Sequence, residues 1–277
     1  MMKTLFPILF VFISVFTFAQ ELKVMSYNIR YDNPGDGKDR WDIRKSELID
    51  LMKSQNASIM GIQEGLYHQV QYLDSCLTNF TYSGVGRDDG ITRGEYSAIF
   101  YDSTLFSAEE ELTFWLSETP DTISVGWDAS MERICTYAKL KHKESGLIIH
   151  VFNTHFDHLG EKARLESAML IIDKIMELCY EDEHIILMGD FNAEPGSEPI
   201  RQLFSFFNDI DPHQIDMQYG GPVGTFTGFD PEAIAEKRID YIFTANIELL
   251  SYTHLDRLRK NGRRISDHLP VIVKIKM

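Results

Sequence analysis

The stretch Ile185–Glu194 reads IILMGDFNAE, an apolar run, a glycine and a polar tail in that order. The run Ile185–Met188 is short and has no polar interruption, which predicts a β-strand buried on both faces. Gly189 lets the backbone turn tightly out of that strand. Asp190 and Asn192 lie two residues apart, so on extended chain they project to the same side. The stretch therefore places a carboxylate and an amide where open α/β sheets hold their ligands. Taken alone, it is equally consistent with an Asp/Asn-rich turn that closes a strand.

The same design, an apolar strand with polar residues at its end, recurs along the chain. Predicted strands over Leu22–Ile29, Ser58–Ile62 and Leu147–Phe152 all end in or next to polar side chains. The polar residues at such strand ends are Asn28, Glu64, His155 with Asp157, Asp190 with Asn192, Asp240, and Asp267 with His268. One polar strand end can be explained as an ordinary turn, but the same arrangement at several strand ends is harder to explain in that way. The repetition therefore predicts that these residues form a shared site.

Strand–helix units alternate with strand hairpins in both halves of the chain. Arg133–His142 and Leu147–Phe152 flank a turn at Gly146 and predict a hairpin. Apolar residues at helical spacing predict helices over Trp41–Ser54, Leu66–Leu77 and Glu161–Tyr180. Two mixed β-sheets packed face to face, with the helices outside, would bury these apolar faces. We therefore expect an α/β protein with one domain over residues 20–277.

Two features of composition limit the partners of this chain. The 277 residues carry a formal charge of −15 at pH 7, which repels polyanions and disfavours nucleic-acid binding through a basic surface. A local cationic pocket or a bound metal can still hold one phosphate. The cysteines Cys76, Cys135 and Cys179 are too few for a disulfide framework, and we interpret them as buried thiols, although an oxidising compartment permits one bridge.

The first residues have the pattern of a targeting segment. Lys3 is followed by Thr4–Ala19, a run without charge that is shorter than the ~20 residues of a membrane span. The small residue Ala19 ends that run. We predict a signal peptide over residues 1–19 and a secreted or periplasmic mature protein, monomeric and without a stable membrane span. A membrane anchor is the alternative for the same run.

The residue types at the strand ends indicate a kind of chemistry. Carboxylates with an Asn amide are hard oxygen ligands suited to Mg²⁺ or Mn²⁺, whereas zinc would require more His or Cys at ligand spacing. Histidines that are not needed as ligands are then free for acid–base work. A metal, a His and an Asp that orients the His together predict a phosphoester hydrolase.

The ordered motifs also resemble those of a known family. Tyr27-Asn28, Ile62-Gln63-Glu64, Asn153-Thr154-His155, Gly189-Asp190-Phe191-Asn192, Arg238-Ile239-Asp240-Tyr241 and Ser266-Asp267-His268-Leu269-Pro270 are similar to the signature segments of the endonuclease/exonuclease/phosphatase (DNase I-like) superfamily. They appear in that family's order and span nearly the whole predicted mature chain. The resemblance implies a four-layer α/β/β/α sandwich and a divalent-metal-dependent phosphoesterase.

The resemblance also implies roles for individual residues. Glu64 would be the main metal ligand, with Asn28 beside it and Asp267 completing the metal side. Asp190 would orient or deprotonate the attacking water, and Asn192 would hold the phosphate or the metal. His268, oriented by Asp240, would contact the scissile phosphate or act as general acid–base, and His155 would stabilise charge on the phosphoryl oxygens.

Further segments resemble a secreted bacterial subgroup of that family and suggest substrate-binding residues. Arg164, at the start of the long predicted helix, is placed to reach a substrate phosphate, or is only a solvated helix-end charge. Asp157 either belongs to the site or caps a loop. Trp115 and Trp127 lie in the aperiodic stretch Thr113–Ala129, which predicts a long loop. These two rings would either stack on a base, sugar or lipid group or pack the loop onto the domain.

These observations lead to one main prediction and two alternatives. We predict hydrolysis of a phosphodiester or phosphomonoester on a small molecule or lipid headgroup. A metal-dependent nuclease is the first alternative, and the acidic charge weighs against it. A binding protein that has lost catalysis is the second, and the intact set of acids and histidines weighs against that. The basic run Arg257–Arg264 we interpret as an exposed turn.

Overall fold

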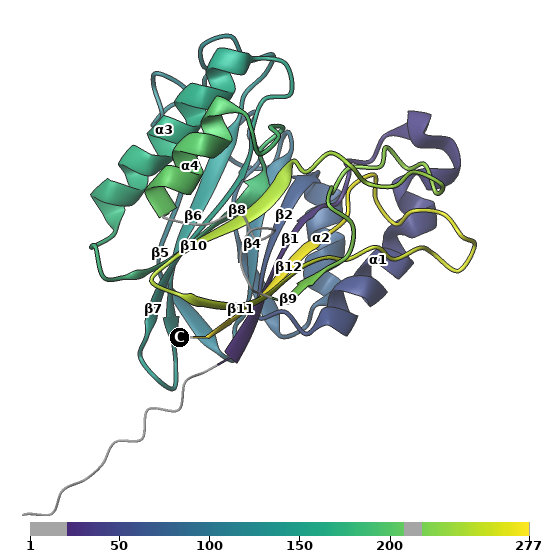
Figure 1. Ribbon diagram of the computed structural model, residues 1–277, viewed down its shortest axis with the longest axis horizontal. Helices are drawn as coiled ribbons and strands as arrows, with labels where there is room; N and C mark the ends of the chain where they lie inside the picture. The colour runs from purple at the N-terminus through teal and green to yellow at the C-terminus, as the bar shows by residue number, and fades with distance from the viewer. Residues whose placement is uncertain (1–20, 208–217, 277) are drawn as a thin grey trace, which may run out of the picture.

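The computed structural model describes residues 21–207 and 218–276, and the signal peptide predicted over residues 1–19 lies outside these ranges. Two mixed β-sheets pack face to face with helices on both outer surfaces, as Figure 1 shows. In strand order, the first sheet consists of β3 (Phe80–Ser83), β4 (Tyr96–Asp102), β2 (Ile59–Gly65), β1 (Glu21–Asn28), β12 (Val271–Lys276), β11 (Glu248–His254) and β9 (Gln218–Gly220). The second consists of β10 (Asp240–Ala245), β8 (His184–Asp190), β7 (Ile148–His155), β6 (Ile134–His142) and β5 (Phe106–Trp115).

Three apolar layers hold this sandwich together. Helices α1 (Trp41–Gln55) and α2 (Tyr67–Cys76) pack on the outer face of the first sheet, where Leu48 and Leu73 meet Phe100. Helices α3 (Glu161–Leu178) and α4 (Glu198–Phe207) cover the second sheet. Between the sheets lies a third layer of aliphatic residues, including Val24, Ile186 and Val273. The two packed sheets with outer helices expected from the strand and helix pattern, and the α/β/β/α sandwich that the resemblance implies, are confirmed.

The sheet registers explain why the polar strand ends meet. β1 pairs in parallel with β2, so Asn28 and the end of β2 reach the same edge. β7 pairs in parallel with β8, which places His155 opposite Asp190. β10 runs antiparallel to β8, so Asp240, its first residue, is also opposite Asp190. Strands that are far apart in sequence therefore bring their polar ends to one edge of the sandwich.

Two of the expectations outside the core are wrong. Strand β5 continues to Trp115, so the stretch Thr113–Ala129 begins as strand and not as loop. Trp115 is buried and its Nε1 donates to the carbonyl of Arg87 at 2.8 Å, because the loop after Gly86 covers it. The run Arg257–Arg264 is not simply exposed either. It contains two buried arginines that form ion pairs, Arg259 with Asp39 and Arg264 with Asp256.

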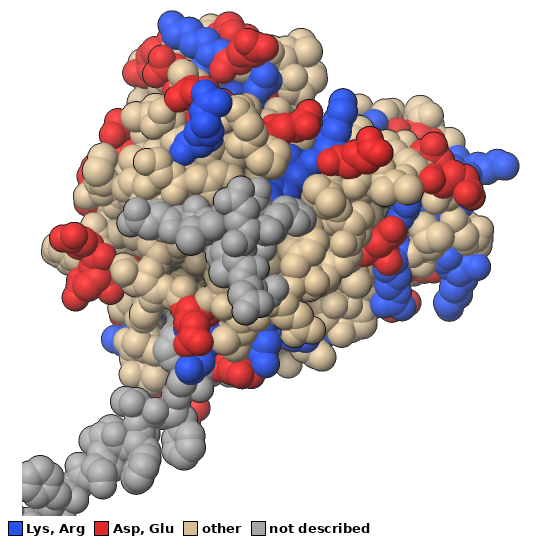
Figure 2. All heavy atoms as spheres, viewed as in Figure 1, with Lys and Arg blue, Asp and Glu red and all other residues tan. Residues whose placement is uncertain are grey.

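The described cysteines form no disulfide, and the described surface carries charges of both signs. Cys135 is buried and Cys76 and Cys179 are half-buried, and in the described ranges all three are free thiols. Burial raises the pKa of the Cys179 thiol to about 12, which argues against a reactive thiolate. None of the described helices combines the length and the apolar character that crossing a bilayer requires. On the face in Figure 2, basic and acidic side chains of the described residues are interspersed over a largely uncharged surface.

Candidate active site

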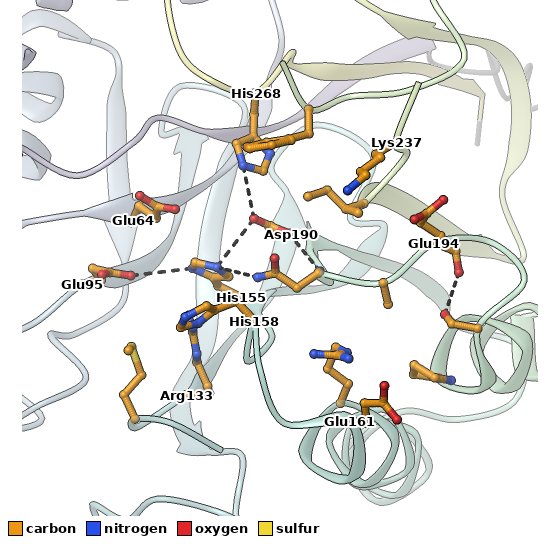
Figure 3. Close-up of a pocket in the computed structure, with 18 of the residues that line it drawn as sticks. Glu64, Glu95, Arg133, His155, His158, Glu161, Asp190, Glu194, Lys237 and His268 are labelled. Carbon is orange, nitrogen blue, oxygen red and sulfur yellow. Dashed lines mark hydrogen bonds and ion pairs between the residues drawn. The ribbon is translucent and has the colours of Figure 1, made fainter. Parts of the chain in front are cut away.

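Asp190 lies at the centre of the polar edge, where it contacts residues from both sheets. Asn28 Nδ2 donates to Asp190 Oδ2 at 2.9 Å and to Glu64 Oε1 at 3.0 Å, so one amide joins two carboxylates. The same Asp190 oxygen lies 3.6 Å from the Nε2 atoms of both His268 and His155. Figure 3 shows Asp190 between these two histidines. A carboxylate is thereby fixed between two imidazoles.

The backbone bends locally to aim these side chains. The pairing of β2 with β4 shifts register between Ile62 and Gly65, and Glu64, inside this irregularity, has a left-handed φ of 63°. Its second carboxylate oxygen accepts a hydrogen bond from Tyr31 N at 3.1 Å. Asn192 is also left-handed, with a φ of 47°, and its backbone N–H donates to Asp190 Oδ1 at 2.9 Å. Non-glycine residues in this conformation are strained, and such strain concentrates at functional sites.

His268 is held as a cation by acids on two sides. Its Nδ1 lies 2.8 Å from Asp240 Oδ2, and the same carboxylate oxygen accepts a hydrogen bond from Thr225 Oγ1 at 2.5 Å. Burial disfavours the imidazolium, but the charges of Asp240 and Asp190 outweigh burial and hold the pKa of His268 well above its usual value. The Nδ1 contact leaves Nε2 facing Asp190 and the cavity, where it can donate a proton.

His155 is the neutral member of the pair. Burial, followed by the charges of Arg133 and Arg87, holds the pKa of His155 well below its usual value. Asn192 Nδ2 lies 3.1 Å from its Nε2 and also donates to the carbonyl of Phe156 at 3.0 Å. On the other side of the ring, Nδ1 lies 3.7 Å from a Glu95 carboxylate oxygen. The two histidines thus differ in charge because they face different neighbours.

The acids of this edge carry surplus negative charge. Burial and the nearby Asp240 raise the pKa of Asp190 to about 7. Burial and the charge of Glu64 raise the pKa of Asp267 as well, against the lowering effects of His268 and Arg30. The Arg30 guanidinium lies 3.8 Å from both Glu64 and Asp267 and also donates to Asp36 at 3.1 Å, so one cation is shared by three carboxylates. Acids that are destabilised in this way favour binding of a further cation.

The donor set fits a divalent metal on the Glu64 side of Asp190. Ligand atoms of Glu64, His155 and Asp190 lie within 4.8 Å of one another, and so do those of Asp190, Asp240 and His268. The first group has two hard carboxylates with Asp267 close by, whereas Asp240 and His268 already bind each other. Asn28 differs from the expectation of a metal ligand, because its amide nitrogen faces the acids. Its Oδ1 accepts from Arg30 N at 3.0 Å.

A cavity of about 1150 Å³ is lined by most of these residues and by some of the predicted peripheral residues (Figure 3). Arg164 lines the cavity, as expected for a residue that reaches substrate. Asp157 does not, and it is almost completely buried, with hydrogen bonds from Ser130 and from the backbone of the following loop. The structure therefore has Asp157 in the loop-capping arrangement, the second of the two readings, and its substrate-binding role stays a prediction. Trp127 and Trp115 do not line the cavity either, and Trp115 packs its segment onto the domain, the second of the two readings for that ring.

Several cavity residues, among them Glu95, Arg133 and Lys237, were not predicted from the sequence, and Arg87 was interpreted as part of a polar turn or of the pocket rim. Glu95 contacts His155, and Arg87 binds Glu95 through two hydrogen bonds of 2.8 and 3.1 Å. Arg133 and Lys237 also line the cavity. The available signal was weak: Glu95 and Arg133 are charged residues that directly precede apolar stretches, where charge usually indicates only the end of a loop.

The sandwich and the acid–histidine edge together define a hydrolase that acts on phosphoester bonds. The Endonuclease/Exonuclease/phosphatase family profile matches residues 25–268, and the chain belongs to that family.

Several individual proteins are similar to this chain over most of its length. The chain is similar to a family member of known structure from Bacteroides thetaiotaomicron, with 38% identity, a TM-score of 0.87 and coverage of 94% of this chain and 98% of that one. A mannosyl-6-phosphatase of the same organism also has 38% identity, with a TM-score of 0.85 and coverage of 92% and 99%. An uncharacterised protein of Acanthamoeba polyphaga mimivirus is 26% identical over 252 residues, 84% of this chain and 91% of that protein.

Proposed function

We propose that the protein is a secreted, divalent-metal-dependent phosphoesterase that hydrolyses a phosphorylated small molecule or headgroup by attack of water on phosphorus. The observation that carries this proposal is the position of Asp190, between one cationic and one neutral histidine at the floor of the cavity. A buried carboxyl with a pKa of about 7 is suited to accept a proton from water near neutral pH. Asp190 is therefore assigned as the residue that orients and deprotonates the water.

The neighbouring side chains divide the remaining tasks. His268, charged and oriented by Asp240, donates from Nε2 to the phosphoryl or leaving oxygen. His155 stabilises charge on the phosphoryl oxygens, and Asn192 fixes the orientation of that ring. Asn28 positions Glu64 and Asp190 relative to each other. Each group is held in place before substrate binds, which is the main source of electrostatic catalysis.

The metal is assigned to Glu64 and Asp267. When bound there, Mg²⁺ or Mn²⁺ would supply positive charge that offsets the repulsion between an anionic substrate and these acids. Oxygen ligands favour such hard cations, and we therefore propose Mg²⁺ or Mn²⁺ as the bound ion.

The substrate class is proposed from the cavity and from one relative. A concave cavity suits a small molecule better than a polymer, and the charge of −15 disfavours polyanions. The mannosyl-6-phosphatase at 38% identity supports a phosphorylated sugar as the first candidate. The proposed domain is residues 20–277, acting as a monomer outside the cytoplasm after removal of residues 1–19.

One comparison of substrates tests this function. Phosphate release is measured from a panel of sugar phosphates, including mannose 6-phosphate, and from p-nitrophenyl phosphate, with Mg²⁺, Mn²⁺ or EDTA. Plasmid nicking is measured at the same protein concentration. We expect metal-dependent phosphate release that EDTA abolishes and that His268→Ala lowers by roughly 10²–10⁴-fold. Plasmid nicking that is faster than phosphate release would indicate a nuclease and contradict the proposed small-molecule substrate. Phosphate release that does not depend on metal would contradict the proposed metal dependence.

A further inference from the structure

A cluster of cationic and imidazole side chains lines the cavity beside His155, and the proposed mechanism does not use it. The cluster consists of Arg133, His158 and Arg164, and we call these three residues the cationic wall. Figure 3 shows Arg133 and His158 next to His155, whereas Lys237 lies on the other side of Asp190. The cationic wall therefore lies on one side of the acidic floor.

A chain of short contacts fixes the geometry of the cationic wall. Asp157 Oδ2 lies 3.3 Å from Arg133 Nε, and the backbone carbonyl of Asp157 accepts a hydrogen bond from Arg164 Nη1 at 3.0 Å. Arg133 Nη2 lies 3.0 Å from His158 Nδ1. Since a guanidinium can only donate, His158 Nδ1 accepts, and the neutral ring then carries its proton on Nε2. The wall thus presents N–H donors in fixed positions.

The buried charge of Arg133 is only partly compensated within the protein. Its side chain is 4% exposed, and its Nη1 makes no hydrogen bond to any described residue. The carboxylate of Asp157 is shared with Ser130 and with the backbone N–H groups of Leu159 and Gly160. Burial lowers the pKa of Arg133, so the cation is destabilised where it lies. An incompletely compensated buried cation favours an anion in the adjoining cavity, where the more accessible Arg164 and His158 can donate to it.

The cationic wall can distinguish phosphomonoesters from phosphodiesters because the two kinds of ester differ in charge. A phosphomonoester carries close to two negative charges at neutral pH, since its second pKa is about 6, whereas a diester carries one. The acidic floor repels the additional charge. We propose that the cationic wall binds terminal oxygens of the scissile phosphate and so selects phosphomonoesters over phosphodiesters. This inference rests on the proposed function, because it concerns the substrate of the same site.

The first experiment compares two esters with the same leaving group, p-nitrophenyl phosphate and methyl p-nitrophenyl phosphate. The variant Arg164→Met keeps an apolar stem and removes the charge of a half-buried side chain. We expect kcat/KM for the monoester to fall by roughly 10- to 100-fold and that for the diester by less than about threefold. His158→Ala, at an exposed position, should also lower the ratio of kcat/KM for the monoester to kcat/KM for the diester. The matched control Lys237→Met removes a cation from another part of the cavity and should leave the ratio unchanged.

The second experiment is independent of turnover. Binding of inorganic phosphate is measured by calorimetry with EDTA present, for the wild type and for Arg164→Met. We expect the wild type to bind phosphate and the variant to bind it about tenfold more weakly. The proposed role of the cationic wall is overturned by any of three results. These are no phosphate binding by the wild type, equal phosphate binding by the variant, or an unchanged ratio of monoester to diester kcat/KM. If neither ester is hydrolysed but phosphate binding depends on Arg164, the proposed function fails while the anion site remains.

Discussion

Replacement of Asp240 by Asn is the sharpest test of the proposed chemistry, because Asp240 affects two catalytic groups at once. Its Oδ2 lies 2.8 Å from His268 Nδ1, and the residue is almost completely buried. A hydrogen bond to a charged group contributes roughly 1.5–3 kcal/mol. At 1.36 kcal/mol for each factor of ten, loss of that bond in the transition state predicts a fall in kcat/KM of roughly 10- to 150-fold.

The pH profile gives a second and more specific readout. Asp190 acts as a base in its ionised form, so activity rises as pH rises through its pKa of about 7. Asp240 raises that pKa, and its removal therefore moves the acidic limb to lower pH. His268 acts as a cation, so activity falls as pH rises through its pKa, which Asp240 also raises. Removal of Asp240 should therefore move both limbs of the profile to lower pH.

The assay is kcat/KM against pH at saturating Mg²⁺, for the wild type and Asp240→Asn. Thr225→Ser keeps the hydroxyl that donates to Asp240 and serves as the matched control, with an unchanged profile expected. Circular dichroism and thermal unfolding establish that each variant is folded. A loss of less than about threefold, or limbs that move in opposite directions, would refute the assignment of Asp240 as the partner of His268.

Three further predictions concern the metal, the strand packing and the loop below the cavity. Glu64→Gln should raise the Mg²⁺ concentration for half-maximal activity by at least roughly tenfold, and an unaltered Mg²⁺ titration would remove Glu64 from the metal site. Gly189→Ala should lower the free energy of urea unfolding by about 1–3 kcal/mol, because a Cβ there would lie 2.2 Å from the carbonyl oxygen of Thr154. Asp157→Asn should lower the thermal midpoint at pH 7. Burial alone would raise the Asp157 pKa, but hydrogen bonds from Gly160 and Ser130 outweigh it and lower the pKa, so this stabilisation is lost as pH falls below about 4. A deficit that does not change with pH would contradict the last prediction.

The overall fold could be predicted from the sequence because its strands are defined by local apolar patterns. The run Ile185–Met188 is buried on both faces, as its composition predicts, and it pairs in parallel with β7. Parallel pairing then requires that the ends of these strands share an edge. The convergence of Asp190 with His155 follows from that rule, although the order of the strands came from resemblance and not from periodicity.

The details of the site could not be predicted in the same way, because they depend on contacts between distant segments. Asp157 has the sequence context of a site residue, yet the loop turns its carboxylate inward to Ser130 and Arg133. Glu95 reaches His155 only because the two sheets pack together. The buried Arg259 is another example, since its partner Asp39 comes from the other end of the chain. Local sequence patterns carry no information about such pairs.

The two histidines show most directly how packing determines chemistry. His268 and His155 are the same residue type, both are buried, and both lie 3.6 Å from the same Asp190 oxygen. Their pKa values move in opposite directions because His268 also faces Asp240, whereas His155 faces Arg133 and Arg87. An acid and a neutral ring therefore flank one carboxylate at the same pH. The asymmetry needed for acid–base chemistry arises from the packing of the two sheets and their loops, and exchange of the charges around one ring should be sufficient to abolish it.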